Sequence, residues 1–197
     1  MYQYRDISTL TRVAVGTLWA LMFTRLLFQS VTFYARSMAS IPLDPGISEA
    51  MGLTAILNLL VLAAALILVG LWIYRANANA HAIGGELTIT PGWAVGWYFV
   101  PFANLVKPFQ AMKETWLASH YGSEWDRGDA TDLLNWWWGL WILSNFIGNF
   151  EWRLGAEVPA LGLVTGVMGV PLNLILMKLM KQIRDGQRTV RHAEVFA

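Results

Sequence analysis

The sequence predicts an all-α polytopic membrane protein with four transmembrane helices and one irregular element at the cytoplasmic face. Residues 51–73 contain no charged residue. A helix rises about 1.5 Å per residue, so this stretch crosses the roughly 30 Å hydrocarbon core of a bilayer. Hydrophobic residues make up 56% of the chain and charged residues 14%, against about 25% charged residues in a soluble domain. The length of 197 residues fits a single membrane domain over 1–197.

Three further stretches are apolar enough to cross the membrane, at about 11–34, 133–152 and 158–177. Residues 13–23 alone have the length of a signal-peptide core. Arg25 interrupts that apolar run before small residues suited to cleavage are reached. We therefore expect the first stretch to be retained as a membrane span.

Basic residues predict the orientation of these spans. With four spans, only Arg36 and Arg153 fall on one side of the membrane. The basic residues on the other side are Arg5, Arg12, Arg75, Lys107, Lys113, Arg127, Lys178, Lys181, Arg184, Arg188 and Arg191. Because cytoplasmic loops are enriched in Lys and Arg, we expect both termini and residues 75–132 to be cytoplasmic.

Aromatic residues mark the ends of two predicted spans. Trp72 and Tyr74 close the second span. A second group lies at the entry of the third span and consists of Trp136, Trp137, Trp138 and Trp141. Indole rings prefer the boundary between hydrocarbon and headgroups, so we expect these residues to anchor the helices there. Stacking against a ligand is the alternative role.

Residues 91–106 are nearly all apolar but short for a span, and prolines and glycines interrupt them, with Pro101 and Pro108 seven residues apart. Prolines break a continuous helix, and Asn104 between them can bond the backbone groups that the breaks leave free. We expect a re-entrant or interfacial element over about 91–119, including a short helix that starts near Pro108. A fifth crossing here would put the basic C-terminus outside.

Two small residues in the fourth span, Gly162 and Gly166, stand one helical turn apart. This spacing lets another helix approach closely. The partner helix could belong to the same chain, to a second copy in a homo-oligomer, or to another protein. Beyond this span, basic residues recur every three or four positions, which predicts a basic helical face suited to anionic headgroups.

Arg25 lies at the middle of the first predicted span. A charge at this depth is costly, so it usually faces the interior of a bundle. Counting along antiparallel spans places Asn58 and Asn145 level with Arg25, and Glu151 nearer the outer face. The alternative is that Arg25 extends along the helix to reach the interface.

The long cytoplasmic connection carries a set of motifs. They are Trp72-Ile-Tyr-Arg75 followed by Asn77-Ala, then Gly92-Trp-Ala-Val-Gly96, then Pro101-Phe-Ala-Asn104-Leu with Pro108, and finally Trp116-Leu-Ala-Ser119. With these motifs the chain resembles a bacterial membrane family known as domain of unknown function 4328, from about residue 51 to residue 184. The resemblance implies a multi-pass protein of a bacterial inner membrane.

Polar residues of this connection form the candidate site. Asn77 and Asn79 follow the second span at a spacing that could face the irregular element. Together with Arg75, Asn104 and Lys107 they could form a polar binding pocket at the inner membrane face. The alternative is that the asparagines close a loop through bonds to the backbone.

The sequence contains no recognisable catalytic constellation. Cysteine is absent, and His81, His120 and His192 all fall outside the predicted spans. We therefore expect no metal, no cofactor and no enzymatic activity. The net charge of +1 argues against binding to nucleic acid. The lipid bilayer is the expected partner, and the expected role is that of an interaction or regulatory module. The alternative is a protein that handles a small solute or a lipid at the polar pocket.

Overall fold

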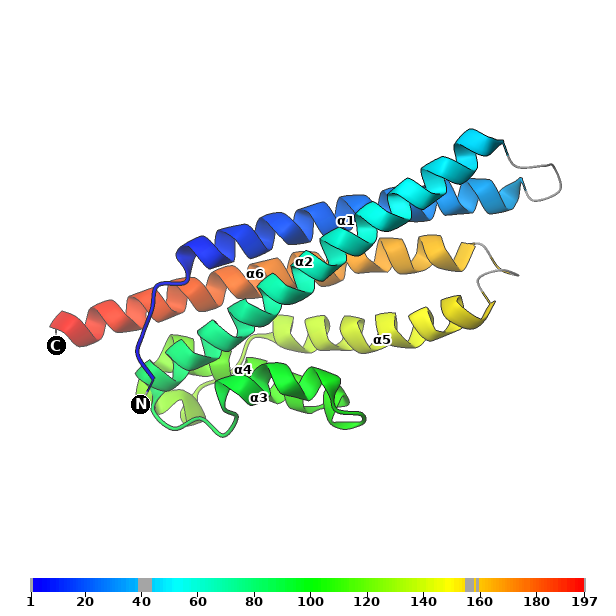
Figure 1. The fold of residues 1–197 in the computed structure, drawn as a ribbon. Coiled ribbons are helices and arrows are strands. Elements are labelled where there is room, and N and C mark those ends of the chain that lie inside the picture. Colours follow the sequence, from blue (N-terminus) through cyan, green and yellow to red (C-terminus); the bar gives the residue numbers. More distant parts are fainter. Residues whose placement is uncertain (1, 39–43, 155–157, 159, 197) are drawn as a thin grey trace. The chain divides into compact units, whose positions relative to one another are not determined.

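The computed structural model describes residues 2–38, 44–154, 158 and 160–196, and most of these residues lie in helices (Figure 1). No strand occurs among these residues. The elements are α1 (Ser8–Ser37), α2 (Pro45–Gly84), α3 (Pro91–Gly96), η1 (Trp97–Phe99), η2 (Ala103–Leu105), α4 (Lys107–Tyr121), η3 (Gly122–Arg127), α5 (Asp132–Leu154) and α6 (Ala160–Phe196). The predicted all-α class is thus confirmed.

Three of the described helices, α1, α2 and α6, are long and apolar enough to cross a membrane. They contain the predicted spans 11–34, 51–73 and most of 158–177. α5 contains the remaining predicted span, but it is not among the three. Its sequence carries three asparagines and five tryptophans, which lower its mean hydropathy. Of the four predicted spans, three therefore lie in helices whose length and composition allow them to cross a membrane.

The chain divides into two compact units. Unit 1 consists of Met1–Val15, Ile67–Trp138 and Ile175–Ala197, and unit 2 consists of Gly16–Leu66 and Gly139–Leu174. Unit 1 contains the short elements from α3 to η3, and unit 2 is built from segments of α1, α2, α5 and α6.

α2 is longer than the predicted span, because it continues for 40 residues before Gly85 ends it with a positive φ of 79°. At about 1.5 Å per residue, such a helix is twice as long as the hydrocarbon core is thick. Asn77 and Asn79 therefore lie on a regular helix. The alternative that they close a loop is wrong, because they lie inside α2.

The element over 91–119 is irregular, as its prolines predict. The short helices α3, η1 and η2 precede α4, and α4 has Pro108 in its first turn. Between them, Ala103 N–H donates to the Pro101 carbonyl at 2.7 Å, and Phe102 has φ 62° and ψ −42°. This is a classic γ-turn, a strained conformation that is rare for a side chain as large as Phe.

Several tryptophans that were expected at the membrane interface are instead buried within unit 1. Trp72 is 0% exposed, and Trp137 and Trp138 are also buried. The Trp138 indole N–H donates to the Leu105 carbonyl at 3.0 Å and so ties η2 to α5. Among these, only Trp136 is largely exposed. Indole groups here serve the protein interior, where their N–H groups find partners.

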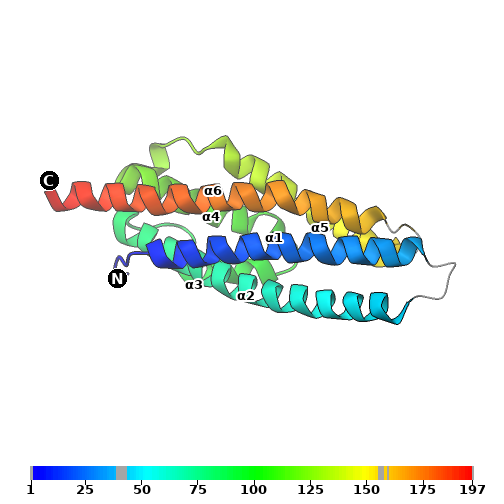
Figure 2. The ribbon, with the colours of Figure 1, turned by 90° about the horizontal axis from the view of Figure 1, so that it is seen from above.

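In unit 2, α1 and α6 lie side by side (Figure 1 and Figure 2). The missing side chains of Gly162 and Gly166 make room for α1. A Cβ at Gly162 would lie 2.5 Å from Gln29 Oε1, and one at Gly166 would lie 3.4 Å from Gln29 Cγ. The predicted close approach is thus made by a helix of the same chain, which contradicts the use of these two glycines as a free surface for a second copy.

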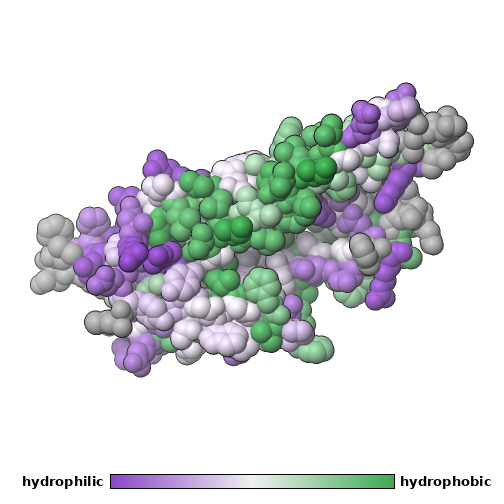
Figure 3. Space-filling model, in the orientation of Figure 1, coloured by the Kyte–Doolittle hydropathy of each residue, from purple (hydrophilic) through white to green (hydrophobic). Residues whose placement is uncertain are grey.

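The part of α2 that belongs to unit 2 exposes a run of large apolar side chains. They are Leu53, Ile56, Leu57, Leu59, Leu60 and Leu66. Figure 3 shows hydrophobic residues gathered over this helix. Exposed leucines in such number would be unfavourable in water, so this surface is suited to the hydrocarbon core of a bilayer.

Candidate functional site

The interior of unit 1 contains a cluster of buried polar side chains, the amide cluster, formed by Asn77, Asn79, Thr115, Ser119 and Gln187. α2 supplies the two asparagines, α4 supplies Thr115 and Ser119, and α6 supplies Gln187. Asn79 is 1% exposed, and Asn77 and Gln187 are 0% exposed. Amide groups removed from water in this way must find partners in the protein.

The amide nitrogen and the amide oxygen of both Asn79 and Gln187 have hydrogen-bond partners. Asn79 Oδ1 accepts the Arg5 N–H at 2.9 Å, and Asn79 Nδ2 donates to the Arg5 carbonyl at 2.7 Å and to Gln187 Oε1 at 2.9 Å. Gln187 Nε2 donates to the Ala76 carbonyl at 2.8 Å and to Ser119 Oγ at 3.1 Å. These bonds connect α2, α4 and α6 with the N-terminal arm, the non-helical residues 2–7.

Asn77 and Thr115 extend the cluster toward the start of α4. Asn77 Nδ2 donates to Thr115 Oγ1 at 2.9 Å, and Thr115 Oγ1 donates to the Ala111 carbonyl at 2.8 Å. Asn77 Oδ1 is buried and has no partner among the described residues. Removing either partner would leave a further polar group unpaired in the interior.

Small residues let the three helices meet at the amide cluster. A Cβ on Gly186 would overlap the Ser119 carbonyl oxygen, and a Cβ on Gly84 would lie 2.7 Å from that of Ala118. Ala76 and Ala80 are fully buried on α2. Because no larger side chain fits, the amide groups reach one another directly, without intervening side chains.

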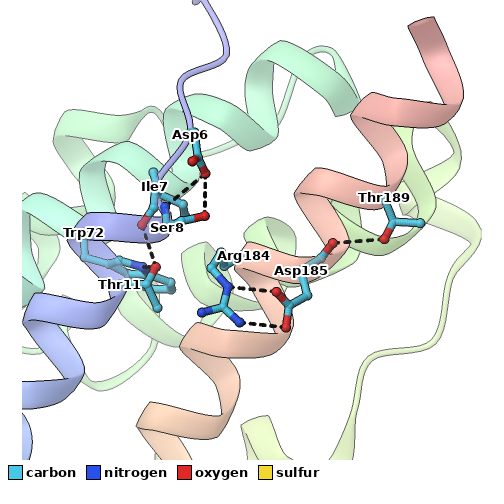
Figure 4. Close-up of polar contacts among 8 residues, drawn as sticks. All are labelled: Asp6, Ile7, Ser8, Thr11, Trp72, Arg184, Asp185 and Thr189. Carbon is cyan, nitrogen blue, oxygen red and sulfur yellow. Dashed lines mark hydrogen bonds and ion pairs between the residues drawn. The ribbon is translucent and has the colours of Figure 1, made fainter.

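Two further sets of hydrogen bonds fix the start of α1, and Figure 4 shows them. The Trp72 indole N–H donates to Thr11 Oγ1 at 2.9 Å, and Thr11 Oγ1 donates to the Ile7 carbonyl at 2.9 Å. Asp6 Oδ1 accepts the backbone N–H of Ser8 at 3.0 Å and its hydroxyl at 2.6 Å, which caps the start of α1. These hydrogen bonds from Ser8 lower the pKa of Asp6.

The α6 segment beside the arm carries the basic residues expected at the cytoplasmic side. Lys178, Lys181 and Arg188 are exposed, whereas Arg184 is partly buried and bonds Asp185 at 2.8 Å (Figure 4). The hydrogen bond to Arg184 lowers the pKa of Asp185. The positive surface is therefore carried mainly by the exposed residues.

The structure does not unite the five residues of the predicted polar pocket. Asn77 and Asn79 are buried in the amide cluster, while Arg75, Asn104 and Lys107 are partly exposed. Lys107 Nζ donates to Gln110 Oε1 at 3.1 Å. The Asn104 backbone N–H donates to the Val100 carbonyl at 2.9 Å, and its side chain makes no hydrogen bond with any described residue. A joint binding role for the five residues stays a prediction.

Unit 2 contains a second polar cluster around Arg25, which is 38% exposed at its side chain. Arg25 Nη2 lies 3.6 Å from Glu151 Oε2 and 3.4 Å from Thr165 Oγ1. Glu151 also accepts hydrogen bonds from Gln29 at 2.9 Å and from Thr165 at 2.7 Å. Arg25 is thus partly exposed and has the Glu151 carboxylate as its counter-charge.

The partners expected for Arg25 were only partly correct. Asn58 is buried nearby, but its Nδ2 donates to Thr24 Oγ1 at 3.2 Å. Asn145 is exposed and donates to the Trp141 carbonyl at 2.7 Å. The number of residues along each helix predicts the depth of these asparagines in the membrane but not the face of the helix on which they lie. For the same reason Glu151 was expected to be farther from Arg25 than the asparagines are.

Sequence reasoning missed Gln187, Thr115 and Gly186. Gln187 is an uncharged polar residue among basic ones. It follows the buried residues Met180 and Ile183 at helical spacing, and this spacing marks the inner face of α6. Ser119 was quoted as part of a motif but not as a site residue. The motif residues Trp72, Asn77 and Ser119 all prove to be buried in unit 1.

The fold and these two polar clusters define an all-helical protein with helices suited to a membrane and a hydrogen-bonded polar interior in one unit. Among the described residues, no group of three or more His, Asp or Glu side chains could hold a metal ion. The chain belongs to the family described as a domain of unknown function, DUF4328, which matches residues 46–184. No curated protein and no solved structure matches the chain.

We predict that Asn79→Leu destabilises the protein far more than Asn104→Leu does. The first substitution leaves both main-chain groups of Arg5 and the Gln187 carbonyl oxygen without their partner, at about 1–3 kcal/mol each where water cannot replace it. The second removes a side chain without protein partners and should cost less than about 1 kcal/mol. The midpoint of thermal unfolding in detergent measures both. A larger loss at position 104 would contradict the assignment of the amide cluster.

Arg25 and Glu151 should show an energetic coupling in a double-mutant cycle. With Arg25→Leu and Glu151→Leu, we expect a coupling of at least about 0.5 kcal/mol, because each residue is the charged partner of the other. The matched cycle of Arg25→Leu with Asn145→Leu should give a value near zero. Thermal unfolding in detergent supplies the energies, and equal coupling in both cycles would refute the pairing with Glu151.

Proposed function

We propose that the protein is a non-catalytic interaction module of a bacterial inner membrane, with four spans and both termini in the cytoplasm. The observation that supports this role is the burial of Asn77 and Asn79. A protein that handles a solute or lipid at the predicted pocket needs these residues at the wall of a hollow, whereas they are 0% and 1% exposed and bonded within the protein. A packed interior favours a rigid platform whose outer surface meets a partner.

We include α5 as the fourth span for three reasons. Its 23 residues reach across the hydrocarbon core. Its exposed residues include Ile142, Leu143, Phe146 and Phe150, which suit contact with lipid. With only three spans, the basic end of α6 would lie on the side opposite to the other basic segments, against the positive-inside rule.

The element over 91–119 is best explained as interfacial. Val95 lies beside Gly70, near the end of the apolar run of α2, where a Cβ on Gly70 would be 3.8 Å from Val95 Cγ1. Phe99 and Phe102 are 80% and 86% exposed. Exposed aromatic side chains at the end of η1 and on the strained turn are suited to enter the headgroup region and hold unit 1 against the inner leaflet.

The exposed basic residues of α6 then form the surface that we assign to a protein partner. Lys178, Lys181 and Arg188 project from a helix whose opposite side contributes Gln187 to the amide cluster. A helix fixed in this way presents its charges in a constant arrangement, which favours recognition of an acidic partner surface.

The proposed topology predicts the outcome of reporter fusions at Asp44, Gly122 and Gly155 and after Ala197. Cytoplasmic signals are expected at Gly122 and after Ala197, and external signals at the other two positions, because basic residues remain inside. Opposite signals at Gly122 and Ala197 would show an odd number of crossings between them, and the four-span arrangement would then be wrong.

The interaction role can be tested by placing a photo-crosslinking amino acid at position 181, 102 or 59 in native membranes. We expect a discrete protein adduct at 181, on the basic face, and lipid adducts at 102, on the interfacial turn. Leu59 is an exposed apolar residue of α2 and serves as the lipid-facing control. If position 181 gives only the lipid adducts seen at 59, the protein is not an interaction module of this kind.

A further inference from the structure

Unit 2 contains a cavity of about 190 Å³ whose wall includes residues of α1, α2, α5 and α6. Its polar lining residues are Arg25, Asn58, Ser144, Thr165 and Asn173. We propose that this cavity is a binding site for a small monocarboxylate with an apolar body, whose carboxylate bonds the Arg25 guanidinium. The inference does not depend on the interaction module, since every lining residue belongs to unit 2.

The charge of the cavity wall favours an anionic group. Arg25 is the one charged residue in the wall as the structure describes it, whereas Glu151 does not line the cavity. A guanidinium carries five N–H donors. Nη2 has Thr165 at 3.4 Å and Glu151 at 3.6 Å, and no described residue accepts a hydrogen bond from the other two guanidinium nitrogens. Arg25 therefore retains a free edge that matches the planar fork of a carboxylate.

Glu151 does not compete for that free edge. Its carboxylate already accepts hydrogen bonds from Gln29 Nε2 at 2.9 Å and from Thr165 Oγ1 at 2.7 Å. Arg25 lies at the longer distance of 3.6 Å. One guanidinium can serve two carboxylates through different nitrogens, so a ligand can be bound without displacing Glu151.

Ser144 is a second group without a partner in the cavity wall. Its Oγ is buried and makes no hydrogen bond with any described residue. An unpaired buried hydroxyl costs free energy. Ser144 comes from α5 and Arg25 from α1, so two of the helices that form the cavity wall carry a polar group with unused hydrogen-bonding capacity.

The size and the remaining lining residues define the body of the ligand. Leu21, Met22, Leu62 and Leu172 make up much of the wall. A cavity of roughly 150 Å³ in an apolar interior holds one benzene molecule. A volume of about 190 Å³ therefore suits a ligand of the size of benzoate or hexanoate and is too small for a whole phospholipid.

A glycine on α5 allows the cavity to be filled by mutation. Gly148 lines the cavity, and a Cβ added there would meet no atom within 4 Å. Gly139 lies on the same helix, also has no atom within 4 Å of an added Cβ, and does not line the cavity. Gly148→Leu should thus occupy the space of the ligand, and Gly139→Leu is the matched control.

The test is titration of the purified full-length protein with benzoate, followed by calorimetry and by the melting temperature. We expect saturable binding by the wild type and by Gly139→Leu, and none by Gly148→Leu. Benzyl alcohol, which keeps the ring but lacks the charge, should bind at least about tenfold more weakly because the charge-assisted bonds are lost. Arg25→Lys should also weaken benzoate binding by about tenfold, since lysine lacks the planar fork.

Two results would overturn the proposal. One is the absence of saturable binding of benzoate, butyrate and hexanoate to the folded wild type. The other is equal affinity for benzoate and benzyl alcohol, which would mean an apolar cavity without a carboxylate site. Should Gly148→Leu fail to fold, ¹³C-carboxyl benzoate in solid-state NMR decides, because its carboxyl carbon must show dipolar contact with the ¹⁵N-labelled Arg25 side chain.

Discussion

The fold of unit 1 depends on the need to satisfy a few amide groups that are removed from water. Asn79 binds both main-chain groups of Arg5 and the side chain of Gln187. Gln187 in turn binds the backbone of α2 and the Ser119 hydroxyl of α4. If any one of these segments moved away, several buried donors and acceptors would lose their partners at once, at about 1–3 kcal/mol each. The cluster therefore fixes four segments together.

Polar groups of unit 2 must also find partners within the protein, because the environment proposed for the outer surface of unit 2 is lipid. Leucines and isoleucines of α2 face outward, and the polar groups of Arg25, Glu151 and Thr165 turn toward one another. An apolar exterior with a polar interior is the arrangement that hydrocarbon favours. The buried hydroxyls of Thr32 and Ser144 have no partner among the described residues. The guanidinium of Arg25 is only partly paired, and it is the group that we assign to a ligand.

The sequence predicted the elements that depend on local properties. Apolar stretches predicted four spans, and three of them lie in helices that are long and apolar enough to cross a membrane. Pro101 and Pro108 predicted the irregular element before α4. It did not predict which faces meet. Trp72 has the same local sequence features whether it faces lipid headgroups or Thr11, and only tertiary packing buries it. The burial of Gln187 also depends on tertiary packing, so its sequence context among basic residues did not predict it. α5 is not among the helices that qualify as spans because asparagine and tryptophan lower its mean hydropathy.

Hydrogen exchange at the backbone amide of Arg5 tests the central claim most directly, because this N–H is bound by Asn79 Oδ1 at 2.9 Å in a segment outside any helix. In the full-length protein we expect Arg5 to exchange as slowly as amides of α4. Gln187→Leu should accelerate the exchange at Arg5, although Gln187 reaches Arg5 only through Asn79. Exchange of Arg5 at the rate of an unstructured peptide, or no effect of Gln187→Leu, would contradict the amide cluster as the interaction on which unit 1 depends.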